Sequence, residues 1–277
     1  MPDTSSARRN LVIRIITGVV AIPLLAVVIW AGLPWVTVVA AIVAAIAATE
    51  VCIMAAKRGE HPSVLVAVVW AWGLVIAGHF SALDVPAYLT VLPAIVAGLV
   101  FAFIGALIQK ASDAASSIAS TTLAACYSGG LLLFVPLLRE APDGTEGLYL
   151  LFIGVFATDI LAYSVGRLIG RHRMAPSISP GKTWEGVVGG LAGGIGAMIA
   201  ATAVFGMGIV VWQAVVLGIV VAAVAMVGDL FESKLKRIAG VKDSGWLVPG
   251  HGGLLDRLDS ILFNIPVLYL FMLWVAP

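Results

Sequence analysis

The chain contains 277 residues, of which 61% are hydrophobic and 11% are charged, and its mean hydropathy is +1.09. Soluble domains are about 45–50% apolar, so this composition excludes a soluble globular fold and predicts an integral membrane protein. A formal net charge of +1 gives no indication of a nucleic-acid partner, and we expect none. The two cysteines lie within apolar segments without a metal-type spacing, so they predict neither a disulfide framework nor a metal site.

After a polar tail, the chain is a series of apolar segments of about 20 residues, the length that crosses a bilayer. The first run is longer than the apolar region of a signal peptide, and no small-residue cleavage site follows it, so we interpret it as a membrane helix. We place the spans at residues 11–33, 35–56, 62–80, 86–108, 116–138, 148–168, 186–206, 208–230 and 257–275. The predicted fold is an all-α integral membrane protein of about nine transmembrane helices. It forms one polytopic domain, 1–277, with a cytosolic tail at 1–10, N-terminal helices at 11–150 and catalytic helices and loops at 151–277.

The basic residues fall on one side of this predicted topology. Of the 16 Lys and Arg residues, only Arg14 and Arg139 lie elsewhere, Arg14 in the membrane beside the same face and Arg139 on the opposite side. The others are Arg8, Arg9, Lys57, Arg58, Lys110, Arg167, Arg171, Arg173, Lys182, Lys234, Lys236, Arg237, Lys242 and Arg257. The positive-inside rule then predicts a multi-pass protein of the inner or plasma membrane. Its N-terminus and polar active-site loops are predicted to be cytoplasmic, and its C-terminus outside.

Two predicted spans contain an acidic residue, which is costly at membrane depth and often functional. Glu50 lies near the predicted cytoplasmic end of its span, so a side chain that simply reaches water is the alternative. Asp159 lies about two turns from the end, with Tyr163 and Arg167 on the same helix face. This spacing predicts a polar stripe that runs to the surface.

The segment before the seventh span predicts a helix start that binds anions. Ser179 is expected to cap this helix with Pro180 in its first turn, leaving free N–H groups beside Lys182 and Thr183. An ordinary capped membrane helix is the alternative, and the spacing of a Walker A loop is absent. Small residues at four-residue intervals follow, among them Gly190 and Gly194, and they predict close helix packing in lipid.

The stretch from Ser233 to Asp259 concentrates charge between two apolar segments. Lysines and arginines beside carboxylates indicate phosphates held with a divalent metal, whereas a solvated basic loop is the alternative. The pair Gly252–Gly253 permits close approach of the backbone to a ligand. A helix that begins near Leu254 would place Asp256 and Asp259 on one face.

This stretch resembles the signature of the phosphatidate cytidylyltransferase family, also called CDP-diacylglycerol synthases, through S-x-L-K-R-x4-K-D-x-G-x2-V-P-G-H-G-G-L-x-D-R-L-D. The pattern D-x-x-A-Y-x-x-G-R-x-x-G from Asp159 and the block S-P-G-K-T-W-E-G from Ser179 are similar to two further blocks of that family. The N-terminal half fits only as a set of hydrophobic helices. The resemblance implies that CTP and phosphatidate react to give CDP-diacylglycerol and pyrophosphate at a cytosolic-face site, beside membrane lipids.

The resemblance and the residue chemistry together assign the expected roles. The predicted catalytic residues are Asp229, Lys236, Arg237, His251, Asp256, Arg257 and Asp259. The predicted substrate-binding residues are Asp159, Tyr163, Ser179, Lys182, Thr183, Trp184, Glu185, Lys242 and Asp243. The candidates to hold phosphates are Lys182, Lys236, Arg237, Lys242 and Arg257. An ionised phosphate nucleophile needs no general base, so His251 is expected to contact substrate or leaving group.

Three carboxylates, those of Asp229, Asp256 and Asp259, are the expected ligands of Mg²⁺, with Mn²⁺ as an alternative ion. The sequence leaves room for a second metal ion or for K⁺ beside the first ion. The alternative for the site is that each carboxylate pairs with a nearby Lys or Arg.

Three other functions would also suit a polar site in a membrane protein. A CTP-dependent lipid kinase of the polyprenol or phytol type shares the substrates and the setting, but the Ser233–Asp259 block fits it less well. A transporter would place its binding groups near the midplane, often in paired repeats, whereas these charges crowd one face. An inactive scaffold would not need the acidic and basic positions. The sequence does not distinguish a monomer from a homodimer.

Overall fold

The computed structural model describes residues 21–108, 113–245 and 252–275. In these ranges, eight helical spans are long and apolar enough to cross a membrane, and a shorter apolar helix, Ala21–Ala31, precedes them. The spans are α2 (Leu33–Lys57), α3 (Val64–Ala82), α4 (Ala87–Ile108), α5 to α6 (Ala114–Glu140), α7 (Gly144–Ile169), α8 (Trp184–Phe205), α9 (Val211–Ile238) and α10 to α11 (Leu255–Val275). The predicted multi-pass all-α membrane fold is confirmed. The predicted first span lies partly outside the described residues.

Two of these spans are interrupted. The first comprises α5 (Ala114–Ala125), the π-helix η1 (Cys126–Gly130) and α6 (Phe134–Glu140). A Cβ on Gly129 would clash with the backbone of Ala71, so glycine lets η1 pack directly on α3. The second is α10 (Leu255–Leu262) followed by α11 (Asn264–Val275).

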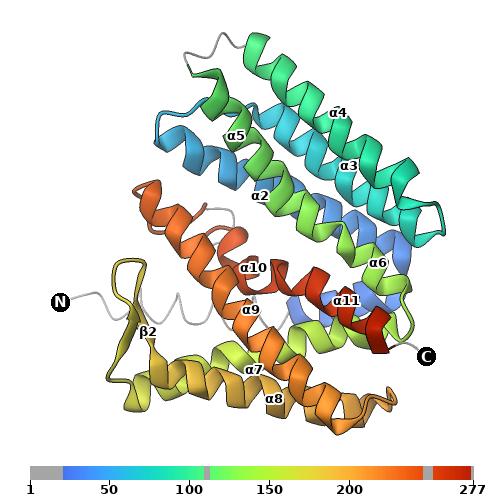
Figure 1. Cartoon of the computed structure of the whole chain (residues 1–277), viewed down its shortest axis with the longest axis vertical. Helices are drawn as coiled ribbons and strands as arrows, with labels where there is room; N and C mark the ends of the chain where they lie inside the picture. The colour runs from blue at the N-terminus through green and yellow to red at the C-terminus, as the bar shows by residue number, and fades with distance from the viewer. Residues whose placement is uncertain (1–20, 109–112, 246–251, 276–277) are drawn as a thin grey trace.

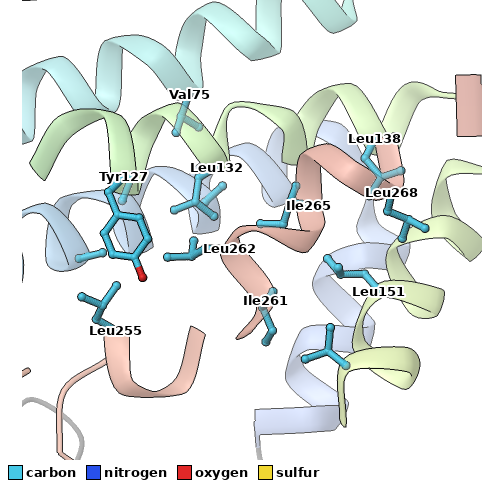
Figure 2. Packing of buried hydrophobic residues seen from close by; sticks show 14 of the residues in the cluster. Val75, Tyr127, Leu132, Leu138, Leu151, Leu255, Ile261, Leu262, Ile265 and Leu268 are labelled. Atoms are coloured by element: carbon cyan, nitrogen blue, oxygen red, sulfur yellow. The ribbon is translucent and has the colours of Figure 1, made fainter. Parts of the chain in front are cut away.

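The helices α10 and α11 lie in the middle of the molecule, between the α2–α6 group and α7 with α9 (Figure 1). Their apolar residues join one buried cluster that also holds residues of α2, α3 and α7. Figure 2 shows Leu262 and Ile265 pointing into this cluster, together with Tyr127 and Leu132 of the interrupted span. The last span is therefore packed against both halves of the chain.

Helix α8 packs closely on α7 and α9 through its glycines, as the small-residue spacing predicts. A Cβ on Gly190 would lie 3.1 Å from the Cβ of Ala162. A Cβ on Gly194 would lie 2.8 Å from Thr158 Oγ1 and 2.9 Å from the carbonyl oxygen of Gly218. Because such contacts leave no room for a side chain, glycine sets the spacing of these three helices.

The prediction that Ser179 caps a helix is wrong. Residues Ser179–Thr183 form strand β2, which pairs antiparallel with β1 (Arg173–Ala175), and α8 begins only at Trp184. Thr183 is the cap, and its Oγ1 accepts a hydrogen bond from the N–H of Gly186 at 3.2 Å. Glycine at position 181 disfavours a helix here. The hairpin is instead stabilised by a hydrogen bond from Arg173 to the carbonyl oxygen of Pro180, at 2.6 Å.

Helix α9 is longer than predicted, because it runs to Ile238 instead of ending near residue 230. The first part of the charged stretch, including Lys234 and Lys236, is therefore helical and not a loop.

The connections between helices lie on two opposite sides of the molecule. The α2–α3 connection and the hairpin lie on one side, and the α3–α4 connection lies on the other (Figure 1).

The glycine packing predicts a position-dependent effect of one methyl group. Gly194→Ala should lower the free energy of unfolding by about 1–3 kcal/mol, the usual cost of overpacking a tight contact. Gly196→Ala is the matched control, since no atom lies within 4 Å of a Cβ built on Gly196. Thermal unfolding in detergent measures both. Equal midpoints for the two variants would show that the contact at Gly194 does not limit stability.

Candidate active site

A cavity of about 790 Å³ lies where α7, the hairpin, α8, α9 and α10 meet. This volume is within the usual range of ligand sites. Its polar lining residues are Thr158, Asp159, Tyr163, Arg167, Arg173, Ser179, Lys182, Thr183, Asp229, Asp256, Asp259 and Ser260. Elements far apart in the sequence therefore bring eight of the sixteen predicted site residues to one place.

Among the residues that the structure describes, three cations line the cavity, and two of them are held by local hydrogen bonds. Arg167 Nη1 donates to the hydroxyl of Tyr163 at 2.6 Å, one turn earlier on α7. Arg173 donates to the carbonyl oxygen of Pro180 across the hairpin. Lys182, on β2, points its Nζ to within 2.8 Å of Asp229 Oδ2. Such an arrangement can neutralise the charges of several phosphate oxygens.

The carboxylates of Asp159, Asp229 and Asp259 line the cavity. They come from three helices, α7, α9 and α10. The predicted polar stripe from Asp159 through Tyr163 to Arg167 lies along the cavity wall. A concentration of acidic oxygens beside lysine and arginine is the type of surface that holds phosphates with a divalent cation.

Asp256 has more hydrogen-bond partners than the other carboxylates of the cavity. Its Oδ2 accepts bonds from the N–H of Ser244 at 2.9 Å, the hydroxyl of Ser244 at 2.9 Å and the N–H of Gly253 at 2.8 Å. Its Oδ1 accepts from Lys236 Nζ at 2.6 Å. A carboxylate accepts about four hydrogen bonds in total, so most of the capacity of Asp256 is used within the protein.

Lys236 joins two carboxylates. It lies one turn after Glu232 on α9, contacts that fully buried side chain, and also contacts Asp256. In the described part of the chain, Lys236 is not among the residues that line the cavity. Its ammonium compensates the charge of a carboxylate that has no exposed surface.

Glu50, from the N-terminal half, also reaches this region. Its carboxylate accepts hydrogen bonds from the N–H of Leu254 at 2.9 Å, the N–H of Leu255 at 2.8 Å and the hydroxyl of Ser244 at 3.0 Å. Only 4% of Glu50 is exposed, so the alternative that it simply reaches water is wrong. Its carboxylate is instead matched by donors from the segment that precedes α10.

Several other predicted residues surround the cavity without lining it in the described structure. Glu185 accepts hydrogen bonds from the N–H groups of Arg171 and His172 and from the His172 ring. Arg237 Nε donates to the carbonyl oxygen of Ile178 at 3.2 Å, which ties α9 to the hairpin. Arg237 is exposed, as are Trp184, Lys242, Asp243 and Arg257. The predicted role of His251 falls outside the described residues.

The sequence pattern did not single out Ser244, Glu232 or Arg173 as site residues. Ser244 and Glu232 become important only through their contacts with Asp256 and Lys236. Arg173 appeared only as one of many loop cations, and the hairpin brings it to the cavity. The rarity of carboxylates inside apolar spans did point to Glu50.

The described residues contain no group of three His, Cys, Asp or Glu side chains in metal-binding proximity. Asp229 and Asp256 each form an ion pair with a lysine, as expected if these carboxylates pair with nearby cations and not with a metal. Asp259 accepts a hydrogen bond from the N–H of Ser260, next in the chain.

Comparison with known proteins places these features in a family. Residues 12–275 match the model of the cytidylyltransferase family. A phosphatidate cytidylyltransferase of Brucella abortus biovar 1 (strain 9-941) is 39% identical over 204 residues, which cover 73% of this chain and 72% of the relative. One from Mycobacterium bovis is 42% identical over 147 residues, 53% of this chain and 48% of the relative. One from Mycobacterium leprae is 46% identical over 129 residues, which cover 47% of this chain and 41% of the relative.

The ion pairs of Lys236 predict a large effect on stability. Lys236→Met should lower the free energy of unfolding by about 3–5 kcal/mol, because it leaves the carboxylates of Glu232 and Asp256 without their cation. Lys234→Met, at an exposed position of the same helix, is the control and should have little effect. Thermal unfolding of both purified variants measures the difference. If Lys236→Met unfolds at the temperature of Lys234→Met, the buried pairs do not stabilise the protein.

Proposed function

The chain belongs to the cytidylyltransferase family, and we propose that it transfers the cytidylyl group of CTP to phosphatidate, forming CDP-diacylglycerol and releasing pyrophosphate. The observation that carries this proposal is the cavity, in which Arg167, Arg173 and Lys182 face the carboxylates of Asp159, Asp229 and Asp259. A triphosphate and a phosphomonoester both require cations, and the acidic groups suit a divalent ion that accompanies the nucleotide.

The reaction is a substitution at phosphorus. A phosphate oxygen of phosphatidate forms a bond to the α-phosphorus of CTP, while the bond from that phosphorus to the oxygen bridging to the β-phosphorus breaks. The electron pair of the broken bond leaves with pyrophosphate, and no general base is needed because the nucleophile is ionised. The two substrates are both anionic, so neutralisation and alignment are the main contributions required of the protein.

The basic residues supply that neutralisation. Lys182 and Arg173 lie on the hairpin that borders the cavity, and Arg167 lies at the end of α7. We assign Lys182 to the triphosphate, since its partner Asp229 holds the ammonium at the cavity wall. Tyr163 orients Arg167 through the hydrogen bond between their side chains.

We propose Mg²⁺ as the cofactor, with Asp229, Asp256 and Asp259 as its carboxylates. Hard oxygen donors that line one cavity fit this ion in their chemistry. Three of the four donors to Asp256 bond Oδ2 and only Lys236 bonds Oδ1, so Oδ1 retains part of its hydrogen-bonding capacity. When bound, the ion would supply positive charge to the phosphate oxygens and the leaving group.

We also propose that the cavity opens toward the cytoplasm, where CTP is found. This orientation is supported by the basic residues, which gather at the helix ends on the same side of the molecule as the hairpin (Figure 1). Lys57 and Arg58 at the end of α2, and Arg167 near the end of α7, belong to this set. The setting is the inner or plasma membrane.

The direct test uses the purified full-length protein in lipid–detergent micelles, with labelled CTP and phosphatidate, with and without Mg²⁺. We expect labelled CDP-diacylglycerol and one pyrophosphate per turnover only when both substrates and the ion are present. Labelled product from the γ-phosphate of CTP would instead identify a lipid kinase. Absence of any CTP-dependent product from folded protein would contradict the proposal.

The carboxylates provide a sharper version of this test. Asp229→Asn and Asp259→Asn should each lower kcat by about a hundredfold, since several kcal/mol of charge stabilisation depend on them. Both should also lose the rise in unfolding temperature that Mg²⁺ gives the wild type, because a ligand of the native state stabilises it. Glu146→Gln, in the first turn of α7, is the control. Wild-type turnover and an unchanged response to Mg²⁺ in both variants would overturn the metal assignment.

The orientation predicts the locations of two reporter fusions. Eight described spans follow residue 32, so a cytoplasmic α2–α3 connection places the end of α11 outside. A reporter that is active only after export should be active when fused after Pro277 and inactive when inserted after Gly59. The reverse pattern would invert the proposed topology.

A further inference from the structure

Glu50 is a buried carboxylate that no step of the proposed reaction uses. It lies near the end of α2, in the half of the chain that contributes no residue to the cavity lining within the described ranges. Among the described residues, its three hydrogen-bond donors come from the charged stretch near the C-terminus: Ser244, Leu254 and Leu255. The contact therefore joins residues about 200 positions apart, as the sequence separations of 194 to 205 show.

The segment around these donors is shaped to receive the carboxylate. A Cβ on Gly253 would lie 2.7 Å from Glu50 Oε2 and would also clash with the hydroxyl of Ser244. A Cβ on Gly245 would clash with Glu50 Oε1. Two glycines thus allow the backbone to close around one acidic side chain. At Gly253, the group that the backbone approaches closely is therefore the carboxylate of Glu50.

The same donors connect Glu50 to the cavity. The hydroxyl of Ser244 lies 3.0 Å from Glu50 Oε2 and 2.9 Å from Asp256 Oδ2, so the two carboxylates share it. Leu254 is the N-cap of α10 and Leu255 is its first residue, so both N–H groups lie at the helix start, whose partial positive charge favours an anion. Since Asp256 and Asp259 follow within the next turn, the position of this helix start sets the position of both.

We propose that Glu50 is a positioning residue for cytidylyl transfer: its carboxylate holds the start of α10 and Ser244, and thereby places Asp256 and Asp259 at the cavity wall. This inference rests on the proposed function. A carboxylate suits the role because both of its oxygens accept hydrogen bonds. An amide of the same shape would turn an N–H₂ group toward a backbone N–H or toward the Ser244 hydroxyl.

The test replaces Glu50 with Gln in the full-length protein. We expect kcat to fall by about a hundredfold, because a small misplacement of groups at a reacting centre can slow the reaction by this factor. The KM values for CTP and phosphatidate should stay within about threefold of the wild type. The amides of Leu254 and Leu255 should also exchange hydrogen faster, whereas those of α3 should not change. Thr49→Val is the matched control, because Thr49 is the adjacent residue and bonds only to Ala45 of its own helix among the described contacts. It should retain wild-type kcat and exchange.

Two further variants protect the test against misfolding of the Gln variant. Ser244→Ala and Gly253→Ala alter the same contact without changing α2, and both should lower kcat with little change in KM. Wild-type kcat per folded molecule in Glu50→Gln, Ser244→Ala and Gly253→Ala would overturn the inference and leave Glu50 with a role in folding alone. An inactive wild type with slow exchange at Leu254 and Leu255 would instead contradict the proposed function, so the two failures are distinguishable.

Discussion

Burial of carboxylates among membrane helices is the constraint on which the rest of this structure depends. A carboxylate removed from water must be surrounded by donors or cations, or it destabilises the fold. Asp256 and Glu50 meet this requirement through the same residue, Ser244, and through backbone N–H groups before and within α10. The requirement therefore fixes where α10 begins, and with it one wall of the cavity.

The opposite wall depends on close packing instead of charge. Glycines of α8 bring it against α7 and α9, so the hairpin before α8 is held over the ends of those helices. Arg237 bonds the hairpin carbonyl of Ile178, and Lys182 pairs with Asp229 of α9. Cations on the hairpin consequently face carboxylates on the helices across a space large enough for a nucleotide and a lipid headgroup.

This arrangement connects the N-terminal helices to the short span that carries Asp256 and Asp259. Helices α10 and α11 lie between the two groups of helices, and their apolar side chains belong to a cluster that includes both (Figures 1 and 2). The polar link from Glu50 and the apolar link through Leu262 and Ile265 act on the same short span. Repacking of α2 would therefore be expected to move α10.

The sequence by itself determined the membrane class, the approximate spans and the residues of the cytidylyltransferase pattern, because composition and local spacing carry that information. Asp159, Tyr163 and Arg167 share a face through helical periodicity alone, and the glycine intervals of α8 predict its packing. The tertiary structure decided which carboxylates have partners, since Glu50 and Ser244 are far apart in the chain. It also decided that Ser179 begins a strand and that α9 continues past residue 230. Arg237 bonds the carbonyl oxygen of Ile178, 59 residues away, and Lys236 pairs with Asp256, 20 residues away. Such contacts between separate elements are not encoded in local propensity, so only the tertiary structure reveals them.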